Sequence, residues 1–218
     1  MRCALEDVFG FELLQVGAWG NDRLLLAAAR TQHTTLLAAC RGAGATLCAE
    51  LASLPLPSDS IDAILLPHTL ELVQDPYAVL REAARVLCAE GCLMICGFNP
   101  WSGWGLRRQF GRTLRRAPFP PGTQRLLSER RLRDWVALLG FDVDRIYGYL
   151  GMLPLAGAAG LTWDGADAPG SALTSGAYLL KARKRVPTLT LVRPRRRVRQ
   201  RVLVGVPEAT STVGHGRR

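Results

Sequence analysis

The sequence predicts a doubly wound α/β domain built on a single seven-stranded, mostly parallel sheet. Short apolar runs alternate with amphipathic segments, as they do where strands and covering helices follow each other. The run Cys92–Gly97 is apolar throughout, which is typical of a strand buried on both faces. With 218 residues, of which 48% are hydrophobic, the chain can form one sizeable core. We expect the domain to occupy residues 1–185.

The first half of the domain supplies five of the expected strands and two helices. The strands are expected over Phe11–Val16, Thr34–Ala39, Ala45–Ala49, Ile61–Leu66 and Cys92–Gly97. The segment Asp22–Thr31, rich in Leu, Ala and Arg, predicts the first helix. A second helix is expected after Asp75, which can cap it, with Pro76 at the first helical position. We expect Gly91 to end this helix.

The second half of the domain supplies one more helix and two more strands. Ser128 is a suitable cap for a helix that runs to about Leu139, and Gly140 ends it. The sixth and seventh strands are expected over Phe141–Tyr149 and Ala177–Ala182.

The positive charge of the chain is concentrated at its end. The net charge is +10, but residues 181–218 hold 12 Lys and Arg against one acid, so the remaining residues have a net charge of −1. We expect residues 186–218 to form a basic, disordered tail. Such a tail suits contact with RNA or another polyanion, and it equally suits a solvated end that aids solubility.

Neither metal binding nor membrane insertion is predicted. Cys88, Cys92 and Cys96 are spaced four residues apart, but Glu90-Gly91 separates the first two and no histidine or further cysteine lies close by, so we expect reduced thiols and no metal site. The first residues lack the pattern of a signal peptide. The apolar run Tyr147–Trp163 is interrupted by Pro154, and it is shorter than the roughly 20 residues of a membrane-spanning helix. We therefore expect a cytoplasmic protein with no membrane span.

One ordered set of short motifs gives the sequence a family resemblance. The motifs are LPLPSDSID at Leu54–Asp62, HTLE at His68–Glu71, the pair Asp75-Pro76, LREAARVL at Leu80–Leu87 and NPWSGWGLRR at Asn99–Arg108. In this order and spacing they resemble the type 11 methyltransferase domain of class I S-adenosylmethionine-dependent methyltransferases, especially a small, uncharacterised bacterial subset. The resemblance implies a Rossmann-like fold and S-adenosylmethionine as cofactor.

The resemblance also implies where the cofactor binds, beyond the carboxyl ends of the strands. The implied cofactor-binding residues are Gly17, Ala18, Trp19, Gly20, Glu50, Leu51, Pro67 and His68. Each has an alternative structural role: the glycines can serve the turn alone, and Glu50 can be a surface acid. His68 is a candidate general base or a structural group, and Asn99 is the second catalytic candidate because it directly follows the fifth strand. Asp62 is expected to fix a turn through hydrogen bonds.

The sequence departs from the family pattern at three places. Gln15 stands where the family has an acid, Trp19 replaces a glycine, and Cys40 with Arg41 replaces the acid that holds the ribose. We expect a methyltransferase, and the alternative is a degenerate, catalytically weak RNA- or partner-binding module. A nicotinamide-dependent oxidoreductase lacks its three-glycine turn here, and a serine hydrolase lacks its G-x-S-x-G elbow.

The methyl acceptor is expected to contact the segment Asn99–Arg133, a lid or substrate insertion. This segment holds nine arginines against one acid, Glu129, together with several aromatic residues. Arginines and aromatic rings suit an anionic or aromatic small molecule, or RNA. The alternative is that the rings pack on the core and the arginines face water.

Overall fold

The computed structural model describes residues 5, 8–17, 26, 30–39, 45–103, 105–106, 122–149 and 175–186. The expected helix over Asp22–Thr31 lies largely outside the described residues, and so does the expected tail over residues 186–218.

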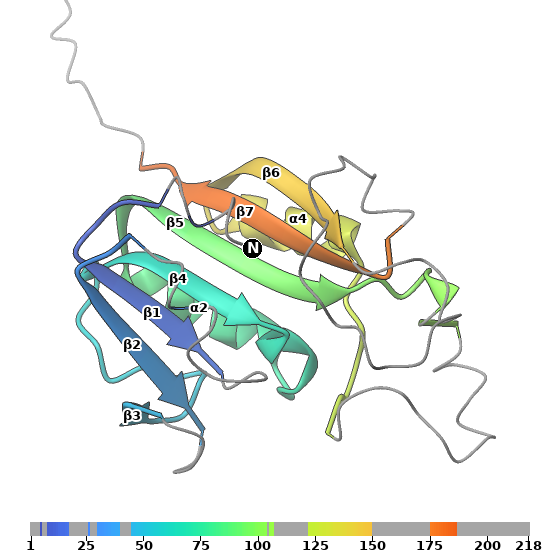
Figure 1. The fold of residues 1–218 in the computed structure, drawn as a ribbon, viewed down its shortest axis with the longest axis horizontal. Coiled ribbons are helices and arrows are strands. Elements are labelled where there is room, and N and C mark those ends of the chain that lie inside the picture. Colours follow the sequence, from blue (N-terminus) through green and yellow to red (C-terminus); the bar gives the residue numbers. More distant parts are fainter. Residues whose placement is uncertain are drawn as a thin grey trace, which may run out of the picture. The chain divides into compact units, whose positions relative to one another are not determined.

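The described residues form one seven-stranded sheet in the order β3-β2-β1-β4-β5-β7-β6 (Figure 1). Its strands are β1 Glu12–Val16, β2 His33–Ala38, β3 Leu47–Cys48, β4 Ile61–Pro67, β5 Leu87–Phe98, β6 Phe141–Tyr149 and β7 Ala177–Lys184. Strands β1 to β5 pair in parallel, whereas β7 runs antiparallel to both of its neighbours. The expected seven-stranded, mostly parallel sheet is therefore confirmed, and β1 and β4 are neighbours.

Two described α-helices begin at the caps that the sequence predicts. Helix α2 spans Pro76–Val86, and the Asp75 carboxylate accepts hydrogen bonds from two backbone N–H groups of its first turn. Helix α4 spans Glu129–Leu138, and the Ser128 hydroxyl accepts from a backbone N–H of its first turn. These caps satisfy donors that a helix start otherwise leaves unpaired.

The predicted end of the second helix at Gly91 is wrong. Helix α2 ends at Val86, and Leu87 is already extended and pairs with Ile61 of β4. The register then shifts at an irregularity, where Glu90 has a positive φ of 61°. Pairing with β4 therefore decides the boundary, because a strand that gains a neighbour outweighs local helical propensity.

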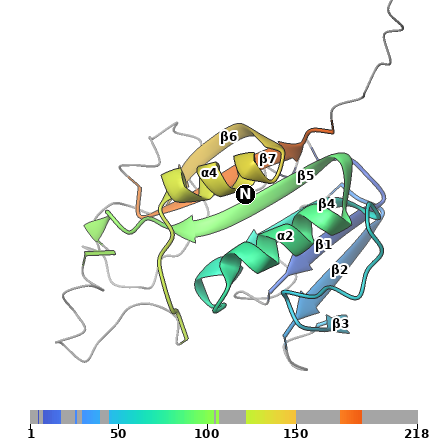
Figure 2. The same cartoon turned by 180° about the vertical axis from the view of Figure 1, so that it is seen from behind.

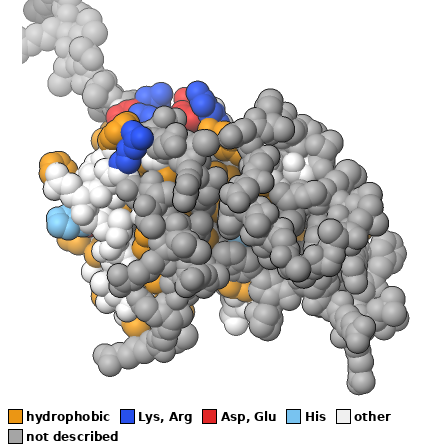
Figure 3. Space-filling model, in the orientation of Figure 1, with side chains coloured by type: hydrophobic (Ala, Val, Ile, Leu, Met, Phe, Trp, Pro, Cys, Tyr) orange, Lys and Arg blue, Asp and Glu red, His pale blue; other side chains and the backbone are white. Residues whose placement is uncertain are grey.

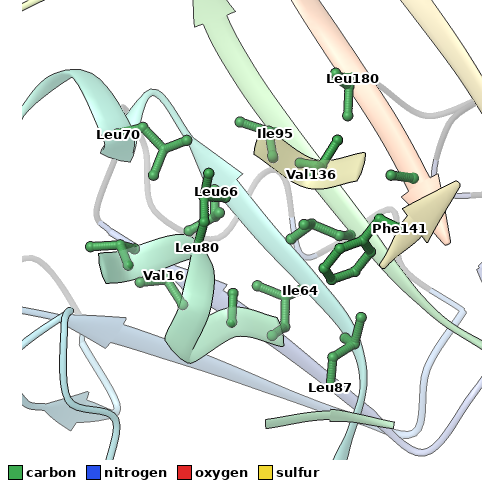
Figure 4. Packing of buried hydrophobic residues seen from close by; sticks show 14 of the residues in the cluster. Val16, Ile64, Leu66, Leu70, Leu80, Leu87, Ile95, Val136, Phe141 and Leu180 are labelled. Atoms are coloured by element: carbon green, nitrogen blue, oxygen red, sulfur yellow. The ribbon is translucent and has the colours of Figure 1, made fainter. Parts of the chain in front are cut away.

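Both faces of the sheet are covered by apolar side chains. One face packs against α2 and α4, which lie together on that side (Figure 2). Figure 4 shows this cluster, in which Val16, Ile64 and Leu66 from the sheet meet Leu80 of α2 and Val136 of α4. The two-sided burial explains why the sequence of β5 is apolar from Cys92 onwards.

The opposite face carries a second apolar cluster. Residues from the start of the chain, among them Leu5 and Val8, pack there against sheet residues such as Leu65 and Met94. Cys92 and Cys96 of β5 also belong to this cluster, so they are buried hydrophobic groups, as expected. The described cysteines are free thiols, and the described part of the chain holds no cluster of side chains suited to a metal ion.

Helix α2 holds the long loop before β4 through one ion pair. The Arg85 guanidinium donates to the backbone carbonyls of Leu54 and Leu56, each at 3.0 Å, and contacts Glu82 at 2.9 Å. Glu82 in turn accepts a hydrogen bond from the Leu54 N–H at 3.0 Å. The motifs LPLPSDSID and LREAARVL are therefore two halves of one clamp, which explains their fixed spacing.

The amino edge of the sheet is held by hydrogen bonds and exposed ion pairs. Asp62 accepts from the N–H groups of Phe11 and Glu12 at 2.7 and 3.1 Å, so its expected structural role is confirmed. Among the described residues, the ion pairs of this edge include Lys184–Asp59, Arg185–Glu90, Arg185–Asp142 and Arg183–Asp144. Figure 3 shows basic and acidic side chains gathered together on this end of the described surface. No described helix is both long and apolar enough to cross a membrane.

Candidate functional site

The turn after β1 requires a glycine at its first position. Gly17 has a φ of +95°, and a Cβ atom there would lie 2.4 Å from Oγ1 of Thr69. The Thr69 hydroxyl donates to the Val16 carbonyl, and the Gly17 N–H donates to Leu37 of β2 at 2.7 Å. Gly17 therefore serves the turn, and its contact with a cofactor stays a prediction. Ala18, Trp19 and Gly20 lie outside the described residues.

Gln15 presents a buried polar atom next to this turn. Its Nε2 donates to the Gly17 carbonyl at 3.1 Å, whereas its Oε1 is buried without a hydrogen-bond partner. Its neighbours across the sheet are the apolar Leu36 and Leu65. A buried acceptor that lacks a donor is costly, so this oxygen is suited to an N–H or O–H group supplied by a ligand. The amide thus supports the turn from the position where the family has an acid.

The turn after β4 carries a network of buried polar side chains. His68 has a left-handed backbone with φ of 53°, and its imidazole Nδ1 lies 3.1 Å from the Glu71 carboxylate. The imidazole Nε2 lies 2.7 Å from the hydroxyl of Tyr149, at the end of β6. The other Glu71 oxygen accepts from the N–H of Phe98, whose ring stacks on the imidazole with centroids 4.1 Å apart. The ends of β4, β5 and β6 are therefore tied together at His68.

The phenol and thiol that face each other beside His68 are both neutral groups. Burial raises the pKa of the Cys96 thiol to about 12, and the Tyr149 hydroxyl beside the thiol lowers this pKa by less. Burial likewise raises the pKa of the Tyr149 phenol well above 10, and the nearby Cys96 and Glu71 raise it further. Burial disfavours the charged form of each group, so both keep their protons near neutral pH.

The remaining candidates lie at the same edge of the sheet but in different settings. Pro67 ends β4 and is buried, in direct contact along the chain with His68. Glu50 follows β3 and is exposed, and Leu51 is half-buried against the core. Because β1 to β4 are parallel, their carboxyl ends share one edge, with Glu50 two strands away from Gly17.

Asn99 is engaged with the backbone at both ends of its side chain. Its Oδ1 accepts from the Trp101 N–H at 3.0 Å, and its Nδ2 donates to the Ser175 carbonyl at 3.0 Å. These contacts tie the segment after β5 to the start of β7. They suit a positioning residue, and a direct catalytic role for Asn99 stays a prediction.

The described arginines of the Asn99–Arg133 segment lie on the surface. Residues 129–133 form the first half of α4, where Arg133 pairs with Glu129 and Arg131 lies 4.9 Å from the Trp135 ring centroid. Trp101 is 70% exposed, so its indole does not pack on the core. The other tryptophan of the NPWSGWGLRR motif and most of the arginines lie outside the described residues.

Three residues of the site were not predicted from the sequence: Glu71, Phe98 and Tyr149. Glu71 ends the recognised HTLE motif, so its position carried a signal without indicating a role. Phe98 and Tyr149 each end a strand, β5 and β6, and nothing local in the sequence links them to His68. Only the register through β7, in which Ala177 lies opposite both residues, brings them together.

Comparison with known proteins gives relatives of two kinds. An uncharacterised protein of Escherichia coli, YafS, is 35% identical over 136 residues, which cover 62% of this chain and 55% of YafS. A malonyl-[acyl-carrier protein] O-methyltransferase of Laribacter hongkongensis is 40% identical over 68 residues, which cover 31% of this chain and 23% of that enzyme. The matches thus span about half and about a quarter of these two relatives.

The fold and the family agree with each other. An S-adenosylmethionine-dependent methyltransferase of Thermotoga maritima has a similar structure, with a TM-score of 0.58 and 19% identity over 80% of this chain and 82% of that one. This likeness shows the shared fold. Residues 22–95 match the model of the methyltransferase domain family, and the match includes β4, α2 and most of β5. Residues 22–95 are therefore similar to the methyltransferase domain family, and the chain shares its fold with a solved S-adenosylmethionine-dependent methyltransferase.

Proposed function

We propose that the chain binds S-adenosylmethionine at the carboxyl edge of β1, β3 and β4, and that it transfers the methyl group to an acceptor. The observation that carries this proposal is the pairing of β1 with β4. From β1 the chain winds outward to β3, and from β4 it winds the other way, so the strand order reverses between these two strands. Open α/β sheets bind ligands at this reversal point, outside the carboxyl ends of the strands.

The described residues at this edge suit parts of the cofactor. The positive-φ turn at Gly17 has no side chain to block a close approach, and the unpaired Gln15 Oε1 can accept from an amino group. The exposed Glu50 carboxylate can accept from hydroxyl or amino groups of the adenosine. When bound, S-adenosylmethionine supplies a methyl group already activated by a sulfonium.

The protein is left with binding and alignment. Gly17 and Gln15 shape the turn, and the left-handed backbone at His68 directs the chain across the end of β4. Holding two reactants in line accounts for a large part of the rate enhancement, of the order of 7 kcal/mol or more. Rigid strand ends are well suited to this task, because their positions are fixed by the sheet.

The acceptor class rests on weaker support. The similarity to a malonyl-[acyl-carrier protein] O-methyltransferase favours an oxygen acceptor, and the exposed Trp101 offers a surface for a flat or apolar group.

For the basic tail we propose contact with RNA or another polyanion. Changing Arg195, Arg196 and Arg197 to Gln in the full chain should then lower RNA affinity and flatten its salt dependence. An unchanged salt slope would remove the tail from this role.

Calorimetric titration of the full chain with S-adenosylhomocysteine and S-adenosylmethionine tests the proposal. We expect saturable binding of both, and about tenfold weaker binding for Glu50→Gln, which corresponds to about 1.4 kcal/mol. His33→Gln is a matched control, since His33 is exposed at the amino end of β2. No binding at millimolar ligand would contradict the proposal and favour a degenerate RNA- or partner-binding module.

A further inference from the structure

Three polar side chains form a chain that runs inward from the carboxyl edge of the sheet. Tyr149 at the end of β6 is half-buried, His68 after β4 is buried, and Glu71 of the short helix η2 (Thr69–Glu71) is buried. The Tyr149 hydroxyl lies 2.7 Å from His68 Nε2, and His68 Nδ1 lies 3.1 Å from Glu71. Each member thus touches the next, and they come from three different elements.

The imidazole is held in one orientation. A carboxylate only accepts hydrogen bonds, so Nδ1 carries the hydrogen that points to Glu71, and in the neutral imidazole Nε2 then accepts from Tyr149. Phe98 stacks on the ring with an interplanar angle of 27°, and its N–H fixes the other Glu71 oxygen. A left-handed backbone is uncommon for a non-glycine residue, and such conformations cluster at functional sites. The His68 imidazole is thus a base whose orientation is fixed by the Glu71 carboxylate.

We propose that Tyr149, His68 and Glu71 form a proton relay for an acceptor that carries a neutral hydroxyl group. The inference rests on the proposed function and deepens it, because it assigns the acceptor class. Tyr149 is the outer member and contacts the acceptor. His68 and Glu71 act through Tyr149 and are positioning residues.

The transfer step balances without a further reactant. The acceptor hydroxyl gives its proton to the Tyr149 oxygen while the Tyr149 proton passes to His68 Nε2. The acceptor oxygen forms the bond to the methyl carbon as the carbon–sulfur bond of the cofactor breaks, and that electron pair stays on sulfur. The positive charge left on the imidazole is stabilised by Glu71 at 3.1 Å.

The groups that face His68 let its imidazole receive the proton of Tyr149. Among the described residues these groups include Glu71 from η2, Tyr149 from β6 and, through Tyr149, Cys96 from β5. Burial raises the pKa of the Tyr149 phenol, so the phenol stays protonated and accepts a proton only as it gives one to His68. The relay therefore works below the pH at which a free phenol would ionise.

The same reasoning gives the relay no role for an acceptor that is already an anion. A carboxylate has no proton to lose at neutral pH, so it needs no relay. The malonyl group is such an acceptor, and the relay therefore separates this chain from the malonyl-[acyl-carrier protein] O-methyltransferase, of which it matches 23%.

A spectroscopic experiment tests the relay without turnover. The chain has three histidines, so nitrogen NMR of the full-length protein with S-adenosylhomocysteine resolves His68, assigned by its loss in His68→Asn. Asn tolerates the left-handed backbone and keeps the fold. We expect a neutral imidazole with hydrogen on Nδ1, and a shift of the Nε2 signal in Tyr149→Phe. Tyr147→Phe, on the same face of β6, should leave it unchanged. A doubly protonated His68 at pH 7 would overturn the relay.

A transfer assay tests the acceptor class. The probes are simple phenols, catechols and primary alcohols, each paired with its carboxylic acid, together with methyl-labelled S-adenosylmethionine. We expect label on hydroxyl compounds, with kcat lowered about 100-fold by Tyr149→Phe and KM for the cofactor unchanged, as for the loss of general base catalysis. Tyr147→Phe should stay within about twofold of wild type.

The outcomes separate the two proposals. Failure to bind S-adenosylhomocysteine would contradict the proposed function. If the protein binds it, label on carboxylates alone, label on no hydroxyl compound, or a wild-type kcat in Tyr149→Phe would each overturn the relay and leave the proposed function standing.

Discussion

The two edges of the sheet use polar residues in opposite ways. At the carboxyl edge, Gln15, His68 and Glu71 are buried and take fixed orientations. At the amino edge, the ion pair of Arg185 with Glu90 is about half exposed on both sides. Burying polar groups is costly and exposed ion pairs contribute little, so stability alone does not account for the carboxyl edge. The difference is what the proposed function predicts for an edge that binds a ligand.

The largest expected effect is at the turn after β1. Gly17→Ala forces a left-handed alanine and places its Cβ 2.4 Å from Thr69, which should lower the free energy of unfolding by about 3 kcal/mol. Gly122→Ala is a matched control, because Gly122 has a φ of +89° and nothing within 4 Å of the added atom. It should cost about 1 kcal/mol. Equal losses in urea unfolding would show that Thr69 does not constrain this turn.

The next effect is at the amino edge. Asp62→Ala removes the acceptor for the N–H groups of Phe11 and Glu12, and it should cost about 2 kcal/mol. Asp62→Asn keeps one acceptor oxygen, so its loss of stability should be less than half that of Asp62→Ala. Binding of S-adenosylhomocysteine should stay unchanged in both folded variants. A change in affinity would break the distinction between the two edges.

A smaller effect depends on pH. The hydrogen bond from Arg85 lowers the pKa of Glu82 below its ordinary 4.5. Its stabilisation is therefore present above pH 4.5 and is lost as the pH falls through the lowered value. Glu82→Gln should be less stable than wild type by about 1 kcal/mol at pH 7. This difference in the free energy of unfolding should disappear in acid. A difference that persists below pH 3 would contradict the clamp.

The smallest effect is expected at the exposed ion pairs. Arg185→Gln should change the free energy of unfolding by less than about 0.5 kcal/mol, and added salt should reduce even this change. A loss as large as that of Asp62→Ala would mean that surface charges hold the amino edge after all.

The fold was largely predictable from the sequence, because its signals are local. Asp75 and Ser128 cap the helices that they were expected to cap, and Phe141–Tyr149 is a strand with the predicted bounds. The end of α2 was not predictable, since Leu87 leaves the helix to pair with Ile61, a residue far away in the chain. A non-local contact outweighed the local signal of Gly91.

The candidate site was predictable only in part. Gly17 and His68 lie at the expected strand ends because turn residues and motif order are visible in a sequence. The partners of His68 were not predictable, since Tyr149 is 81 residues away and reaches His68 only through the register of the sheet. The recognised motifs were themselves ambiguous: two of them meet in the Glu82–Arg85 clamp, whose hydrogen bonds hold the loop at Leu54 and Leu56.

Amide hydrogen exchange with and without S-adenosylhomocysteine tests the central claim most directly. Ligand at the carboxyl edge should slow exchange at Gly17, at Glu50–Leu51 and at His68–Glu71, and leave Phe11 and Glu90 at the amino edge unchanged. Protection confined to the amino edge, or no protection at saturating ligand, would contradict the account.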